Sequence, residues 1–190
     1  MSIFENFDEL SSRAHKAARD AGWYTDLSTG RHKERNTGEL YALIHSELSE
    51  ALEGYRKNLM DDKLPDRKMV EVELADTLIR IADYCGYRKF ELDSWLNYIK
   101  KDKKALLLVK SDNIGELIAN THLMVSYAYG NVSQMGDTTW FLARAVAYIQ
   151  YIGEKLNLDL NGAVREKMSY NAKREDHKIE NRKLENGKKF

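Results

Sequence analysis

The stretch "LIHSELSEALE", residues 43–53, places two glutamates three positions apart in a run that otherwise has the periodicity of a buried helix face. Glu47 and Glu50 share one face of such a helix, because residues at i and i+3 are neighbours on its surface. Further along, "VEVELADTLIRIAD", residues 70–83, repeats the arrangement with Glu73 and Asp76. The two stretches predict two amphipathic helices that each carry a pair of carboxylates.

The connection between these helices predicts that the four carboxylates meet. A turn centred near Asp62 joins the helices, and Pro65 and Asp66 are suited to begin the second one. Glu50 lies 12 residues before Asp62, and Glu73 lies 11 residues after it. In an antiparallel hairpin the two pairs of carboxylates would then lie at the same height along the helices. Solvated helix faces in a chain with 32% charged residues are the alternative interpretation.

Four carboxylates at one height would repel one another, and a hard divalent cation would relieve that repulsion. Oxygen ligands without histidine or cysteine favour Mg²⁺, with Mn²⁺ as a substitute, over zinc. Mg²⁺ held by a few carboxylates leaves positions for water and substrate phosphate, so phosphoanhydride hydrolysis is the chemistry to expect. A di-iron carboxylate bundle would need Glu-x-x-His pairs, and none of the five histidines has that spacing.

The rest of the chain predicts an all-α protein made of one domain. Helical periodicity runs throughout the 190 residues, there is a single proline, and no stretch alternates as a half-buried strand would. Thirty basic residues balance thirty acidic ones, which gives no argument for nucleic acid as a partner. No window approaches the roughly 20 apolar residues that span a bilayer. The single cysteine, Cys85, favours a reducing compartment and a packing role, so we expect a cytoplasmic protein that is not attached to a membrane.

Several stretches resemble the MazG-like nucleoside triphosphate pyrophosphohydrolases, an all-α superfamily that includes the dimeric dUTPases. These are the two acidic helices at 36–57 and 71–86, "GWY" at 22–24, "EKMSYNAKR" at 166–174 and the closing "GKKF". The resemblance implies cleavage between the α and β phosphates of a nucleotide. It also implies that Glu47, Glu50, Glu73 and Asp76 bind Mg²⁺, and that Glu50 helps to orient or deprotonate the attacking water.

The resemblance also gives roles to the C-terminal part of the chain. Lys167, Asn171 and Arg174 fall at i, i+4 and i+7, which predicts one stripe of the last helix. They resemble the family's positions near the substrate phosphates and sugar. Without the resemblance, such a basic stripe is typical of a solvated face.

An internal repeat predicts how the site is arranged in the chain. "NTGELYALIHSELSEA" at 36–51 aligns with "NIGELIANTHLMVSYA" at 113–128, and a second match follows at an offset of 68 residues. In the second copy the four acids are replaced by Met124, Tyr127, Phe141 and Arg144. We expect a metal-binding unit at about 36–90, a degenerate unit at about 111–165, and a phosphate-contacting helix and tail at about 160–190. Convergent helix patterning is the alternative.

Three functions remain open from the sequence. A (d)NTP pyrophosphohydrolase that cleans the nucleotide pool comes first, and a dUTP- or dCTP-specific pyrophosphatase comes second. A non-catalytic helical interaction module is the alternative from a different class, and it predicts no Mg²⁺ binding. The sequence leaves open whether two copies form a homodimer.

Overall fold

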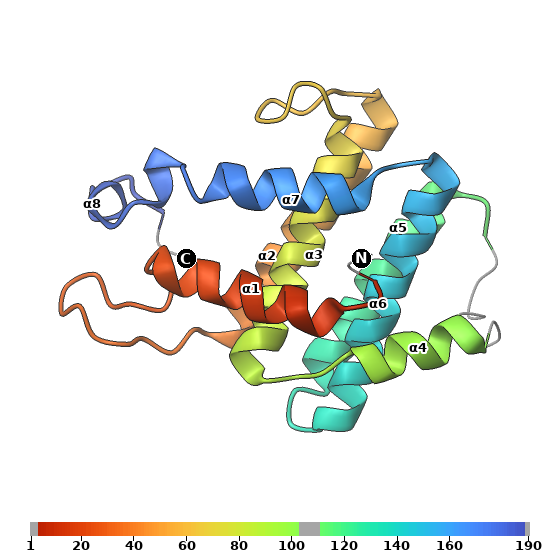
Figure 1. Cartoon of the computed structure of the whole chain (residues 1–190), viewed down its shortest axis with the longest axis horizontal. Coiled ribbons are helices and arrows are strands. Elements are labelled where there is room, and N and C mark those ends of the chain that lie inside the picture. The colour runs from red at the N-terminus through yellow and green to blue at the C-terminus, as the bar shows by residue number, and fades with distance from the viewer. Residues whose placement is uncertain (1–3, 103–110, 189–190) are drawn as a thin grey trace.

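The computed structural model describes residues 4–102 and 111–188, and this part of the chain folds as an all-α bundle (Figure 1). The described residues contain no strand, only two isolated bridges, Thr25 with His32 and Met60 with Lys68. The all-α prediction is therefore confirmed. The elements are α1 (Phe7–Asp20), α2 (Thr37–Lys57), α3 (Met69–Arg88), α4 (Asp93–Lys101), α5 (Ile114–Gly130), α6 (Met135–Leu156), α7 (Leu160–Asn171), the 3₁₀ turn η1 (Glu175–His177) and α8 (Ile179–Arg182).

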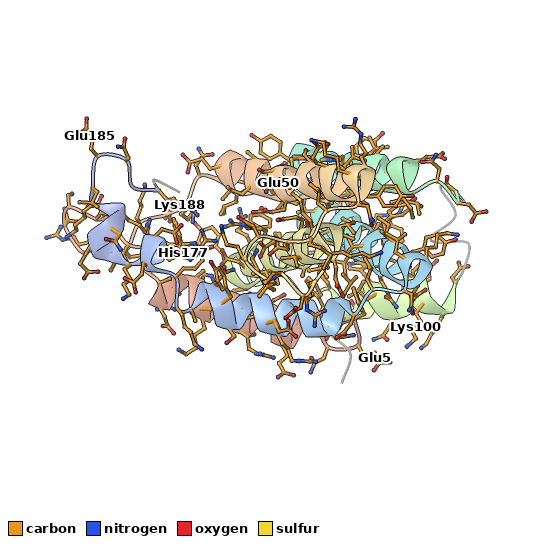
Figure 2. All side chains as sticks on the ribbon, turned by 90° about the horizontal axis from the view of Figure 1, so that it is seen from above. Glu5, Glu50, Lys100, His177, Glu185 and Lys188 are labelled. Atoms are coloured by element: carbon orange, nitrogen blue, oxygen red, sulfur yellow. The ribbon has the colours of Figure 1, made fainter. Side chains whose placement is uncertain are left out.

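Helix α3 lies at the centre of the bundle, in contact with α1, α2, α6 and α7. Its apolar residues are buried around the whole helix, because it has neighbours on several sides. Helices α1 and α7 both cross α3 on the side away from α2 (Figures 1 and 2). Cys85, on α3, is fully buried, which confirms its packing role.

Two glycines allow the neighbouring helices to approach α3 closely. A Cβ atom at Gly86 would lie 2.4 Å from the Ser11 carbonyl oxygen of α1. A Cβ atom at Gly54, on α2, would lie 2.8 Å from the Val70 backbone nitrogen at the start of α3. Both distances are far inside van der Waals contact, so these helix pairs depend on the missing side chain.

Helices α5 and α6 form a second packed pair, and α5 contacts α2. The α2–α3 pair and the α5–α6 pair share local features. Asn36 caps α2 by accepting from the Glu39 backbone N–H at 3.1 Å, and Asn113 caps α5 by accepting from the Glu116 N–H at 3.1 Å. Helices α3 and α6 end at left-handed residues that lie 68 positions apart, Lys89 and Asn157. The offset equals that of the second sequence match.

Two details of the chain differ from expectation or lie beyond the description. Helix α3 begins at Met69, so the prediction that Pro65 and Asp66 begin it is wrong. The Asp61 carboxylate accepts from the Lys63 and Leu64 backbone N–H groups and holds this segment in a turn instead. Residues 103–110, between the metal-binding and degenerate units expected from the sequence, lie outside the described residues. Among the described helices, none combines the length and apolarity needed to cross a membrane.

Candidate metal and phosphate site

Three of the four predicted carboxylates meet between α2 and α3. Glu47 of α2 and Glu73 and Asp76 of α3 each offer an oxygen, and these oxygens all lie within 4.8 Å of one another. Glu47 is only 8% exposed and Glu73 only 6%. The i, i+3 spacing and the hairpin between the helices bring these groups together, as the sequence predicts.

Glu50 lies apart from this cluster. It is exposed, and its Oε1 accepts a 3.2 Å hydrogen bond from the Ser46 hydroxyl one turn earlier. Glu50 and the three clustered carboxylates nevertheless line one cavity. Figure 2 shows Glu50 on the ribbon of α2. The structure therefore brings Glu50 to the rim of the site, with its carboxylate open to solvent.

Two cations lie beside the cluster. The Lys167 ammonium of α7 lies 2.8 Å from Asp76 Oδ2, and the lysine side chain is only 4% exposed. Arg80, one turn after Asp76 on α3, donates from Nε to Glu47 Oε1 at 3.1 Å, and its Nη2 lies at the same distance from that oxygen. One cation comes from the phosphate-contacting stripe predicted by the sequence. The sequence does not predict a role for the other, Arg80, although its i+4 position after Asp76 places both residues on one face of α3.

The carboxylates perturb one another strongly. Burial, followed by the charges of Asp76 and Glu47, raises the pKa of Glu73 to about 9. Burial also raises the pKa of Glu47, against the opposing effect of Arg80. Burial alone would lower the pKa of Lys167, but Asp76, Glu73 and Asp61 together raise it above its ordinary value. Burial and mutual repulsion thus both disfavour the ionised carboxylates, and the two cations offset these effects only in part.

The residues present fit a hard divalent cation. The donor set is made of carboxylate oxygens from two rigid helices, with no histidine or thiol among them. Burial first, and the neighbouring carboxylates second, keep a proton on Glu73, and a bound cation would favour its ionised form instead. Glu47, Glu73 and Asp76 are the residues that would hold it.

A cavity of about 770 Å³ opens from this cluster. This volume lies within the range of small-molecule sites. Its walls come from α1, the loop after α1, α2, the turn before α3, α3, α7 and the tail after α7. Helix α1 contributes small side chains that leave room: Ala14, Ala17 and Ala18. The cavity therefore extends from the carboxylates along α3 toward the end of α1.

The predicted C-terminal residues all line this cavity, but not all on one helix. Lys167 and Asn171 lie on α7, and the Asn171 Oδ1 is buried without a hydrogen-bond partner among the described residues. Helix α7 ends at Asn171, so the prediction that Arg174 continues its stripe is wrong. Arg174 follows the helix in extended backbone, and its Nε and Nη2 bind Asp176 at 2.9 and 2.6 Å.

The tail closes the far end of the cavity. Arg182 of α8 donates to the Gly22 carbonyl at 2.9 Å, and its guanidinium lies 3.7 Å from the centroid of the Trp23 ring. His177 packs edge-on against Trp23, with ring centroids 5.2 Å apart. Burial, then Arg174 and Lys188, lowers the pKa of His177 to about 4, so its ring is neutral at pH 7. Figure 2 shows His177 and Lys188 on this tail, beyond the end of α7.

Comparison of the chain with protein-family models, with curated proteins and with solved structures finds no match.

Proposed function

We propose that this protein is a Mg²⁺-dependent nucleoside triphosphate pyrophosphohydrolase that acts in the cytoplasm on the nucleotide pool. It cleaves between the α and β phosphates and releases a nucleoside monophosphate and pyrophosphate. The observation that carries the proposal is the meeting of Glu47, Glu73 and Asp76 beside the buried Lys167, in the wall of a cavity of about 770 Å³. The sequence resemblance to MazG-like enzymes supports the same reaction.

In the proposed reaction the metal and Glu50 have different roles. A bound Mg²⁺ supplies charge compensation for the phosphates and lowers the pKa of the attacking water. Glu50, open to solvent at the rim, takes the proton of that water as its oxygen bonds to the α-phosphorus. The bond from the α-phosphorus to the bridging oxygen breaks, and pyrophosphate leaves with the electron pair.

Basic groups on α7 and the tail complete the phosphate environment. Lys167 already faces the carboxylate cluster and is placed to contact a phosphate oxygen held there. Arg174 lines the same cavity, and a phosphate can compete with Asp176 for its guanidinium. The unpartnered Asn171 Oδ1 can accept from a sugar hydroxyl.

We further propose that the chain is an internal duplication with one active half. The matched caps and helix ends support this, and His45 of α2 meets His122 of α5, its partner in the repeat, at 2.8 Å between Nδ1 atoms. In the second half, Phe141 packs against Tyr127, ring centroids 5.2 Å apart, at the positions that correspond to Glu73 and Glu50. Aromatic contact thus replaces the acidic cluster.

The test is pyrophosphate release from each common dNTP and NTP with Mg²⁺, using the wild-type chain and Glu50→Gln. We expect release to fall by about 100-fold or more in the variant, because a lost general base has that effect. Glu53→Gln, one turn further along α2 and outside the cavity, is the matched control and should leave release unchanged. If the wild-type chain releases pyrophosphate from none of them, the proposal fails and the interaction-module alternative takes its place.

A further inference from the structure

Arg35 carries two hydrogen-bond donors that nothing in the described structure uses. Its Nε and Nη2 are buried and have no hydrogen-bond partner, and the residue as a whole is only 8% exposed. Arg35 also forms part of the wall of the large cavity. A buried donor without an acceptor destabilises a fold by roughly 1–3 kcal/mol, so a ligand that supplies acceptors would bind favourably here.

The unused pair is the side-on edge of the guanidinium, which binds two neighbouring acceptors at once. Two other arginines show this edge in use. Arg67 donates from Nε and Nη2 to the two oxygens of Glu166, both at 2.7 Å, and Arg174 holds Asp176 in the same way. Arg35 has the same edge without a carboxylate. The ligand group it suits therefore presents two adjacent acceptors.

Arg35 lies away from the acidic cluster, where the proposed function places the phosphates. Its guanidinium lies 5.7 Å from the centroid of the Tyr24 ring, and the Tyr24 hydroxyl donates to Asp83 at 2.9 Å. Asp83 follows Asp76 by seven residues on α3, a separation of about 10 Å along the helix axis. A nucleotide whose phosphates lie at Asp76 would direct its base toward Arg35.

The surroundings of Arg35 suit a flat, neutral group. Trp23 and His177 line the same end of the cavity with aromatic rings. Arg182 lies close enough that its pKa is lowered, by burial first and by Arg35 second, so the region disfavours any ligand group with positive charge. Stacking on an aromatic ring stabilises a bound base by roughly 1–3 kcal/mol.

We propose that Arg35 recognises the base of the nucleotide through two adjacent acceptor atoms. Guanine offers O6 and N7, and cytosine offers O2 and N3, whereas no edge of adenine or uracil presents two adjacent acceptors. Guanine and cytosine nucleotides are then the preferred substrates. The inference rests on the proposed function. The Nε and Nη2 atoms are covered in the structure, so binding of the base requires a neighbouring side chain to move.

The experiment is calorimetric binding of the non-hydrolysable α,β-imido analogues of dGTP, dCTP, dATP and dUTP with Mg²⁺. It compares the wild-type chain with Arg35→Lys, which keeps the charge and removes the two-donor edge. Arg31→Lys, an exposed arginine of the same loop, is the matched control. Thermal unfolding of each variant checks that the fold is retained.

We expect the wild-type chain to bind the dGTP or the dCTP analogue roughly 10-fold or more tighter than the other two. In Arg35→Lys this preference should disappear, while binding of the dATP and dUTP analogues changes less than about threefold. The α,β-imido analogue of 7-deaza-dGTP lacks N7, so weaker binding of it than of the dGTP analogue assigns the contact to guanine. Tighter binding of the dCTP analogue assigns it to cytosine.

Two results would overturn the inference in distinguishable ways. Equal weakening of all four analogues in Arg35→Lys would show that Arg35 binds phosphate, and the proposed function would stand. Absence of binding by every analogue to the wild-type chain would overturn the proposed function and this inference together.

Discussion

The Lys167 ammonium lies 2.8 Å from the Asp76 carboxylate, and both side chains are largely buried, 4% and 14% exposed. This pair joins α7 to α3 at the acidic cluster. A buried ion pair of this kind contributes little net stability, yet breaking it leaves a charge without a partner. Lys167 therefore neutralises Asp76 in the metal-free fold, and in the proposed complex it faces the phosphates.

Lys167→Met should destabilise the metal-free protein. The substitution keeps most of the packing volume but leaves Asp76 beside Glu73 and Glu47 without its cation, so we expect a loss of about 2 kcal/mol or more in the free energy of unfolding. Urea denaturation in the presence of a chelator measures it. Lys173→Met, at an exposed position just after α7, should change stability by less than about 0.5 kcal/mol. Equal effects of the two substitutions would contradict this account of the pair.

Glu73→Gln should stabilise the metal-free protein while removing its response to Mg²⁺. The folded pKa of Glu73, about 9, exceeds its ordinary value of 4.5, so the folded state binds the extra proton at pH 7 and the glutamate lowers stability there. Glutamine carries no such charge, and we expect a gain of about 1–3 kcal/mol. Thermal unfolding with and without Mg²⁺ measures both effects. Stabilisation of the variant by Mg²⁺ as large as that of the wild type would argue against the cluster as the metal site, and Glu53→Gln is the control.

The His45–His122 contact between α2 and α5 should make stability depend on pH. Burial lowers the pKa of both rings, and His45 lowers that of His122 further. The unfolded state therefore binds more protons, so the neutral pair's contribution is present above about pH 6.5 and is lost as the pH falls through the folded values. Both rings are partly exposed, so the effect is at most about 1 kcal/mol.

The double substitution His45→Gln with His122→Gln should flatten this dependence between about pH 7.5 and 5.5. Urea denaturation at several pH values measures the slope. His32→Gln, at an exposed position, is the control. A double variant whose stability falls with acidification as steeply as that of the wild type would place the effect elsewhere in the protein.

The two asparagine caps should contribute equally to stability. Asn36 and Asn113 accept from backbone N–H groups at the same 3.1 Å distance at the starts of α2 and α5. We expect Asn36→Ala and Asn113→Ala each to lower the free energy of unfolding by about 1 kcal/mol. Denaturant unfolding of both variants tests it. A clear loss in only one would indicate that the two helix starts are not equivalent.

The sequence predicts the helices and the meeting of four carboxylates, of which three meet in the structure. Both predictions follow from local periodicity and the length of one connection. It does not distinguish Glu50 from Glu47. Residues at i and i+3 are turned about 60° from each other around a helix, so one member of the pair can face α3 while the other faces solvent. Only the packing of α2 against α3 decides which of the two glutamates faces α3.

The remaining differences also come from contacts between distant segments. The turn that delays α3 to Met69 depends on the Asp61 side chain, and the Arg174 position depends on where α7 ends. The unused edge of Arg35 depends on how the loop after α1 and the tail fold together. No local pattern contains that information.

The most direct test of the proposed metal centre is the anomalous X-ray signal of Mn²⁺ in crystals grown with a non-hydrolysable α,β-imido nucleotide. The account predicts Mn²⁺ bound by oxygens of Glu47, Glu73 and Asp76, with the phosphates on the same ion and beside Lys167. Mn²⁺ bound elsewhere, or a nucleotide whose phosphates lie away from these carboxylates, would contradict it.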